Sequence, residues 1–459
     1  MRSSLQTLQH VRVVRTAVAF IAAGALAVTA AGCGDDGDDS GGGGGQTDKS
    51  GAGVKLPNLD GESLRVGAVW TGPEQENFEK VVDGFEEQTG ATVEYVPTGD
   101  NVASFVRTQV AGGEPPDVVF APQVGVLQEF VKEGWAKPLN AAAKKELAKN
   151  FSQGWQDLGA VDGEQYGVYA KAANKSLIWY NTMAFENAGA QEPKDWQGFV
   201  ETAQLISDSG VPPVAVGGAD GWTLTDWFEN IYLSQAGPEK YDQLAAHEIP
   251  WTDKSVTDAL TTLGELFGND ALIAGGNEKA TKMAFPDSAT APFADLENPK
   301  AAMVFEADFV GAFVNETDAQ VGQDAKVFPF PAVGADSPVV TGGDAAVTLT
   351  GSKGAQALLT YLAGTEAAET WAEPGGFISP NKNMDMSWYP NDVQREIAQA
   401  LVDAGDDFRF DMSDQAPADF GGTEGKGEWK ALQDFLADPK DVEGAQQALE
   451  KAAAAAYEK

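Results

Sequence analysis

Tryptophan and polar side chains that follow predicted strands are the residues best suited to ligand chemistry in this sequence. Of its 11 tryptophans, Trp70 ends a short apolar run and is followed by Glu74. Asp100 follows a second predicted strand, and Gln123 follows a third. Ligands of open α/β sheets bind beyond the carboxyl ends of the strands. These four residues are therefore candidate ligand contacts.

Each of these four residues also has a structural alternative. Trp70 can complete a core strand, and Glu74 can favour the start of a helix through the helix dipole. Asp100 can shape a turn, and Gln123 can be an ordinary loop residue that does not contact the ligand.

A second candidate group follows a glycine-rich segment in the middle of the chain. Trp222 ends the segment at 217–222, which we expect to be a flexible loop, and Asp226 and Trp227 follow it. Sugar rings have apolar faces and a rim of hydroxyls, so they are bound by aromatic faces together with hydrogen-bonding groups. This pattern predicts sugar binding, and packing within a core is the alternative for both tryptophans.

Composition excludes several classes of function. Lys and Arg number 31 against 69 Asp and Glu, a formal net charge of −38, so nucleic acid is not an expected partner. The single cysteine and two histidines leave little for a metal centre or for nucleophilic catalysis, and we expect neither a metal nor a cofactor. A glycoside hydrolase needs only two placed carboxylates, so it stays an alternative, as does a carbohydrate-binding adhesin.

The first sixty residues predict export and anchoring. Residues 1–32 combine early arginines, an apolar stretch and small residues, which is typical of a signal peptide. The ending AAGC at 30–33 resembles the lipobox of bacterial lipoproteins, which implies a lipid on Cys33 and a location on the outer face of the cytoplasmic membrane. The remainder of residues 33–60 is rich in Gly and Asp and predicts a flexible linker.

The elements expected after the linker alternate between strands and helices. Phe78, Val81, Val82 and Phe85 are spaced as one face of a helix, which Thr89-Gly90 ends. The other expected elements are strands at 64–70, 91–96 and 117–120 and helices starting near 127, at 256–267 and at 441–457. This alternation predicts an α/β fold with a sheet covered on both sides.

A series of segments resembles family 1 extracellular solute-binding proteins, the carbohydrate-binding class of ABC importers. They occur in family order: FEEQTGATVEYV (85–96), GGEPPDVVF (112–120), EGWAKPL (133–139), DGEQYGVY (162–169), WYN (179–181), PKDW (193–196), AAMVFEADF (301–309), GGDAAV (342–347) and GGFISP (375–380). Within the class, WTGPE (70–74) and FDMSDQAP (410–417) are similar to α-glucoside binders.

The resemblance implies a type II periplasmic-binding-protein-like fold, in which two α/β lobes are joined by crossing strands with the ligand cleft between them. We expect residues 61–170 and 301–346 in lobe one, and residues 171–300 and 347–459 in lobe two. The implied function is capture of a sugar, such as an α-glucoside oligosaccharide, by hinge closure and its delivery to an ABC permease. We expect a monomer without enzymatic activity.

The resemblance adds candidate residues along the later chain. Glu306 and Asp308 lie in AAMVFEADF, where family members place a cleft residue, and Asp344 lies in GGDAAV. Lys171 follows the first expected crossing, with a solvated lysine as the alternative. We interpret Asp411 and Asp414 as members of a capped turn rather than as cleft residues. Trp388 and Trp429 are expected in the core.

Overall fold

The computed structural model describes residues 54–334, 337–404 and 408–458. Residues 52–459 form one compact unit. The predicted signal peptide, Cys33 and most of the predicted linker lie outside the described residues. None of the helices in the described ranges is both long and apolar enough to cross a membrane.

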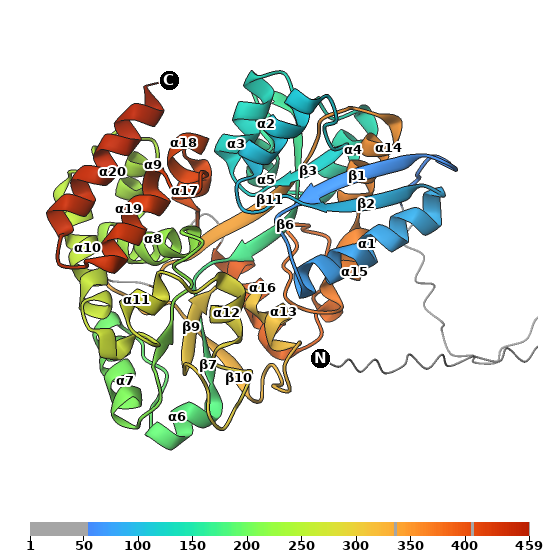
Figure 1. Cartoon of the computed structure of the whole chain (residues 1–459). Coiled ribbons are helices and arrows are strands. Elements are labelled where there is room, and N and C mark those ends of the chain that lie inside the picture. Colours follow the sequence, from blue (N-terminus) through green and yellow to red (C-terminus); the bar gives the residue numbers. More distant parts are fainter. Residues whose placement is uncertain (1–53, 335–336, 405–407, 459) are drawn as a thin grey trace, which may run out of the picture. The chain divides into compact units, whose positions relative to one another are not determined.

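The strands form two main sheets, which define two lobes (Figure 1). Lobe one is built on the sheet ordered β12-β11-β3-β1-β2, with β6 also paired to β11. Lobe two is built on the sheet ordered β10-β7-β9-β8. The strands of lobe one are β1 (Ser63–Ala68), β2 (Thr92–Pro97), β3 (Val118–Ala121), β6 (Gly167–Asn174), β11 (Val340–Thr348) and β12 (Arg409–Phe410). Those of lobe two are β7 (Leu177–Asn181), β8 (Val214–Ala215), β9 (Met303–Glu306) and β10 (Ala325–Pro329).

The first unit of lobe one follows the predicted pattern. Strand β1 pairs in parallel with β2 and β3, and its apolar side chains are buried. Helix α1 (Pro73–Thr89) buries Phe78 and Phe85, and it ends at Gly90, whose φ of 76° lies in the left-handed region that glycine favours. The alternation of strand and helix is therefore confirmed in this part of the chain.

Other helices cover the sheet of lobe one. They are α2 (Val102–Gly112), α3 (Val124–Lys132), α4 (Ala141–Asn150), α5 (Gln153–Leu158), α14 (Lys353–Leu362), α15 (Thr365–Ala372) and α16 (Asp392–Ala404). A short hairpin of β4 (Ala160–Val161) and β5 (Glu164–Gln165) precedes β6, and the 3-10 helix η2 (Met386–Trp388) precedes α16.

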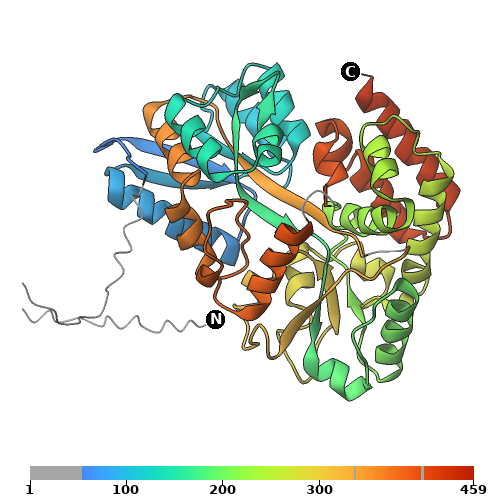
Figure 2. The ribbon, with the colours of Figure 1, turned by 180° about the vertical axis from the view of Figure 1, so that it is seen from behind.

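Lobe two is rich in helices, as the view from behind also shows (Figure 2). They are α6 (Thr182–Ala188), α7 (Trp196–Asp208), α8 (Trp222–Ala236), α9 (Pro238–Ala245), α10 (Lys254–Phe267), η1 (Asp270–Leu272), α11 (Asn277–Ala280), α12 (Phe285–Thr290), α17 (Met412–Gln415), α18 (Ala418–Gly421), α19 (Gly427–Ala437) and α20 (Val442–Tyr457). Helix α10 begins after Asp253, whose carboxylate accepts the amide N–H of Ser255, as expected of a helix cap. The short helix α13 (Val310–Val314) follows β9.

Strands β6 and β11 are the crossing strands between the lobes (Figure 1). They pair antiparallel from Thr341↔Asn174 to Val347↔Gly167. The register shifts between Asp344 and Ala345, which pair with Lys171 and Tyr169, so Ala170 has no partner across the ladder.

The predicted assignment of the later chain to the lobes is wrong in two places. Strands β9 and β10, within residues 301–346, pair with β7 and therefore belong to lobe two. Helices α14 and α15, after residue 347, pack on α4 and α1 of lobe one. The chain thus returns to lobe one through β11, and it reaches lobe two again only after α16.

Candidate functional site

A cavity of about 360 Å³ lies between the two lobes and is lined by both. The lobe-one side follows the carboxyl ends of β1, β2 and β3, where an α/β sheet is expected to hold a ligand. It contributes Val69, Trp70, Thr71, Glu74, Gly99, Asp100, Pro122 and Gln123. The crossing strands and lobe two contribute Lys171, Ala173, Lys175, Gly343, Asp344, Asp220, Trp222, Phe285, Pro286, Phe309, Phe313, Asp414 and Trp429.

Aromatic packing holds Trp70 on the lobe-one wall of the cleft. Its ring centroid lies 4.7 Å from that of Phe120, 5.1 Å from Phe78 and 5.2 Å from Trp371. The side chain is only 3% exposed. Trp70 therefore both completes the core behind β1 and lines the cavity, so the two predicted roles coexist.

Trp222 is one of the aromatic side chains on the lobe-two wall. It is the first residue of α8, where a loop was expected, because Gly221 at φ 84° turns the chain directly into the helix. Its ring lies 5.1 Å from Phe285 and 6.1 Å from Phe309. These contacts fix the orientation of a ring that is only partly buried.

Lys171 forms the floor of the cleft on the crossing strand β6. Its Nζ lies 2.6 Å from Oε1 of Glu74 and 3.9 Å from Oδ2 of Asp344, and 5.2 Å from the centroid of the Trp70 ring. Burial opposes the positive charge, but the two carboxylates outweigh it and raise the pKa of Lys171. The alternative of a solvated lysine is therefore wrong.

Lys175 extends the floor toward lobe two and was not predicted. Its Nζ lies 3.2 Å from Asp226, 3.6 Å from Asp414 and within ion-pair distance of Asp411. The same ammonium lies 5.7 Å from the centre of the Trp222 ring. Burial again opposes the charge, and the surrounding carboxylates raise the pKa of Lys175 well above its usual value.

Two glycines of β11 allow the close packing around these lysines. A Cβ on Gly342 would lie 2.8 Å from Cε of Lys175. A Cβ on Gly343 would lie 2.7 Å from the carbonyl oxygen of Lys171 and 3.1 Å from the ring of Trp155. The backbone of β11 can approach β6 here only without side chains.

Asp100 and Asp220 bring two carboxylates to the cleft from different lobes. Asp100 follows β2, and Asp220 precedes α8 and accepts the amide N–H of Phe285 at 2.6 Å. Burial raises the pKa of Asp100 to about 6, and the negative charges of Asp220 and Glu424 act in the same direction. Burial likewise raises the pKa of Asp220.

The family model for bacterial extracellular solute-binding proteins matches residues 71–369. This chain belongs to that family. The osmoprotective compounds-binding protein GgtB of Synechocystis sp. is 34% identical over 399 residues, which cover 85% of this chain and 92% of GgtB. The alpha-glucosides-binding periplasmic protein AglE of Rhizobium meliloti is 30% identical over 394 residues, which cover 83% of this chain and 84% of AglE.

Solved structures of solute-binding proteins share the fold. The bacterial solute receptor AcbH superposes with a TM-score of 0.74 at 22% identity, covering 86% of this chain and 99% of AcbH. RafE in complex with raffinose superposes with a TM-score of 0.68 at 18% identity, covering 85% of this chain and 99% of RafE. The predicted two-lobed, type II periplasmic-binding-protein fold is thus confirmed, and this solute-binding protein has the substrate-binding role of its ABC-importer family.

The cleft of this solute-binding protein includes most of the predicted contacts. Those that line it are Trp70, Glu74, Asp100, Gln123, Lys171, Trp222 and Asp344. They come from separate elements of both lobes and from the crossing strands, as the family fold requires.

Trp227 does not line the cleft. It is 1% exposed, and its ring lies 4.5 Å from that of Phe305 and 6.4 Å from that of Trp196 in the core of lobe two. The core alternative is therefore the correct interpretation for Trp227.

Three predicted carboxylates lie behind the cleft wall instead of on it. Asp226 is fully buried beneath Lys175, and Glu306 and Asp308 are each 1% exposed. Asp308 accepts the amide N–H of Asn174 at 2.8 Å, so it supports the end of β6. Burial raises the pKa of Glu306 to about 8 and that of Asp308 to about 7.

The structure also adds residues that sequence reasoning placed elsewhere or missed. Asp414 and Trp429 line the cleft, which the sequence did not indicate. Asp414 also lies in the expected capped turn, where its N–H donates to Asp411, and Trp429 is as buried as expected of a core side chain. Asp411 caps α17, as expected of a capped turn. Phe285 begins the short helix α12, which has no periodic pattern that would have marked it. Phe309 precedes α13 and ends the segment AAMVFEADF, in which only Glu306 and Asp308 were predicted as contacts.

Proposed function

We propose that this protein is the receptor of an ABC importer for a sugar, such as an α-glucoside oligosaccharide, and that it delivers the sugar to the membrane permease. Lipid on Cys33 would hold it at the outer face of the cytoplasmic membrane. The proposal also takes the protein to act as a monomer.

The observation that carries this proposal is the pairing of aromatic faces with hydrogen-bond acceptors across the cleft. Trp70 and Asp100 come from lobe one, whereas Trp222 and Asp220 come from lobe two. Pyranose rings need both kinds of group, because their faces are apolar and their rims carry hydroxyls. The cavity of about 360 Å³ lies at the lower end of the range of ligand pockets, about 300–1,000 Å³, which favours a short saccharide.

Closure of the lobes around the ligand is the expected mechanism. A ligand shifts an equilibrium between open and closed forms only through its different affinity for the two. A sugar that stacks on Trp70 and Trp222 together makes its full set of contacts only when the lobes approach each other. Small-angle scattering should therefore show compaction when the bound sugar is added.

The names of the two relatives guide the choice of ligands. AglE is described as binding alpha-glucosides and GgtB as binding osmoprotective compounds. α-Linked glucosides are our first candidates, and osmoprotective compounds are the second class to test.

A thermal-shift screen over mono-, di- and trisaccharides tests the proposal. A ligand present at 100 times its dissociation constant should stabilise the protein by about 2.7 kcal/mol. Each stabilising sugar is then incubated with the protein and analysed by chromatography. Intact sugar supports a receptor, whereas fragments would indicate the glycoside hydrolase alternative, in which two carboxylates flank the scissile bond. Stabilisation by no sugar would refute the proposal.

A further inference from the structure

The charged side chains that line the cleft are unequal in sign. Five are acidic and two are basic: Glu74, Asp100, Asp220, Asp344 and Asp414 against Lys171 and Lys175. Both lysines are already paired, because Lys171 contacts two carboxylates and Lys175 contacts three. Among the described residues that line this cavity, no cation is therefore left to pair with an anionic ligand.

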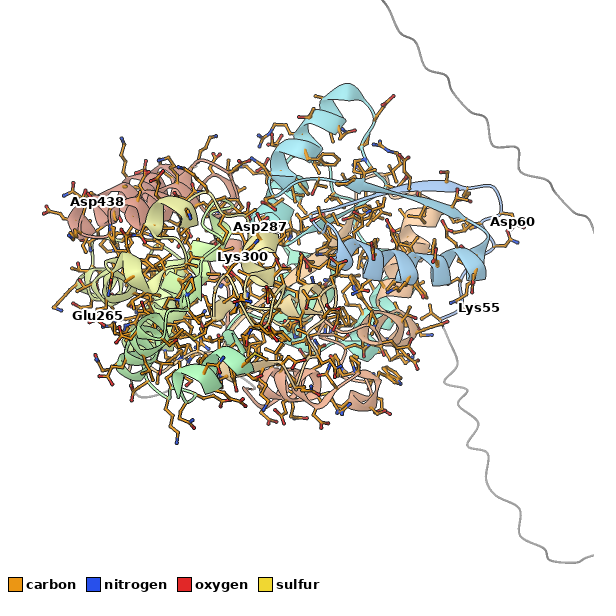
Figure 3. All side chains as sticks on the ribbon, turned by 60° about the horizontal axis from the view of Figure 1, so that its bottom comes forward. Lys55, Asp60, Glu265, Asp287, Lys300 and Asp438 are labelled. Atoms are coloured by element: carbon orange, nitrogen blue, oxygen red, sulfur yellow. The ribbon has the colours of Figure 1, made fainter. Side chains whose placement is uncertain are left out.

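Asp100 and Asp220 are the carboxylates that this pairing leaves out. No salt bridge to either is found within the described residues. The charged groups that shift the pKa values of these two carboxyls are also acidic. Glu424 raises both pKa values, and Asp287 raises that of Asp220. Asp287 belongs to α12 and is labelled near the middle of Figure 3. This end of the cleft therefore carries negative charge without a cation among the described residues to compensate it.

Two buried polar atoms of the residues that line the same cavity have no protein partner within the described ranges. Oε1 of Gln123 and Nε1 of Trp429 make no hydrogen bond, although the side chains are 5% and 1% exposed. Both residues line the cavity. A buried polar atom without a partner costs stability, so an acceptor and a donor held in this way indicate a ligand that carries hydroxyl or amino groups.

We propose that Asp100 and Asp220 make this end of the cleft select its ligand by charge. It accepts an uncharged sugar or its amino derivative and rejects the same sugar carrying a carboxylate or a phosphate. The inference rests on the proposed function, because it takes the ligand to be a sugar. Ammonium and hydroxyl groups donate hydrogen bonds to the two carboxylates, whereas an anionic group meets like charge without a counter-ion.

Calorimetric titration with matched sugars tests this selectivity. One series is glucose, glucosamine and glucuronate, and the other is trehalose, trehalosamine and trehalose 6-phosphate. The anionic member should bind about a hundredfold more weakly than the neutral one, and the amino member at least as tightly. Asp100→Asn and Asp220→Asn should each reduce the neutral-to-anionic ratio by about fivefold or more. The matched control is Asp83→Asn, an exposed position of α1 outside the cleft, which should leave the ratio unchanged.

The outcomes separate this inference from the proposed function. Equal affinity for neutral and anionic members would overturn charge selection and leave the sugar receptor intact. Failure of every sugar to bind, both in these series and in the thermal-shift screen, would refute the proposed function and this inference with it.

If Asp100→Asn and Asp220→Asn no longer bind any sugar, charge selection is tested by measuring the affinities of the unmodified protein at different pH values. Between pH 8 and pH 5 the discrimination between the neutral and carboxylate sugars should weaken, because Asp100 takes up a proton in this range. A constant ratio over the same range would overturn the inference.

Discussion

Replacing Trp222 by alanine tests whether the cleft binds its ligand by stacking. Trp222 opens α8, lines the cavity and is oriented by the rings of Phe285 and Phe309. The substitution removes an aromatic face from lobe two but leaves Trp70 on lobe one. Both the affinity for sugar and the closure of the lobes should therefore weaken.

General contact energies give the size of both expected effects. A sugar ring covers roughly 60 Å² of an aromatic face, which is worth about 1.5 kcal/mol at about 25 cal/mol per Å². The affinity should consequently fall by about tenfold or more. Two aromatic contacts are lost as well, at about 0.5–1.5 kcal/mol each, so the free energy of unfolding without ligand should fall by about 1–3 kcal/mol.

Calorimetric titration with a sugar from the thermal-shift screen measures the affinity, and urea unfolding measures the stability. Trp222→Phe keeps a flat ring and should retain most of the affinity. Trp388→Ala is the control for lost packing, because Trp388 is also partly buried but does not line the cavity. Unchanged affinity of Trp222→Ala, or an equal loss in Trp388→Ala, would refute the stacking argument.

Other substitutions test the charges and the anchor. Lys171→Met leaves two buried carboxylates without their cation, so the free energy of unfolding measured in urea should fall by about 3–5 kcal/mol. A decrease below about 1 kcal/mol would contradict the buried pairing. Burial raises the pKa of Asp100 from 3.8 to about 6, so the folded state binds the proton more tightly and stability falls as the pH rises through this window. Asp100→Asn should therefore raise the melting temperature at pH 8 but not at pH 4. The control Asp83→Asn should raise it at neither pH. An equal rise for Asp100→Asn at both pH values would show that Asp100 does not take up its proton in this range. Cys33→Ala should move the protein from the membrane fraction to the medium with sugar binding unchanged, and a variant that stays in the membrane fraction would argue against the lipid anchor. Because the sequence contains no metal-ligand pattern, EDTA should leave the affinity for sugar unchanged, and a loss restored by calcium would indicate a structural metal site.

Local sequence patterns were sufficient to predict the first unit of lobe one. The helical spacing from Phe78 to Phe85 and the stop at Gly90 predict α1, and the apolar run before Trp70 predicts β1. Together with the rule that ligands lie beyond the ends of strands, these elements placed Trp70 and Asp100 correctly on the cleft. Such predictions succeed because the interactions that decide them lie within a few residues.

The interpretation of α8 failed because a loop was expected where the helix begins. Residues five apart on an α-helix point about 140° away from each other. Trp222 and Trp227 therefore face opposite sides of α8, one toward the cleft and one toward the core. Recognising 222–236 as helical would have separated the two tryptophans.

Long-range pairing explains the remaining differences. Strand β9 joins lobe two because it pairs with β7, more than a hundred residues earlier in the chain. Lys175 owes its role to Asp226 and Asp411, which follow it by 51 and 236 residues. No window of sequence around β9 or Lys175 contains these partners.

The unpaired Ala170 in the ladder between β6 and β11 makes strand length a determinant of the binding site. Side chains alternate between the two faces of a strand, so Tyr169 and Lys171 would share a face in a regular ladder. The extra residue reverses this, because Lys171 pairs with Asp344 while Tyr169 pairs with Ala345, its neighbour on the opposite face. Deleting Ala170 would leave the pairs of Tyr169 with Ala345 and of Lys171 with Asp344 in a regular ladder, so the ammonium of Lys171 would stay on the face of Asp344. Gain of one codon between Asp344 and Ala345 would instead give Ala170 a partner and place Lys171 on the same face as Tyr169. Such an insertion would redirect the charge on the floor of the cleft, a route to new specificity that is separate from point substitution.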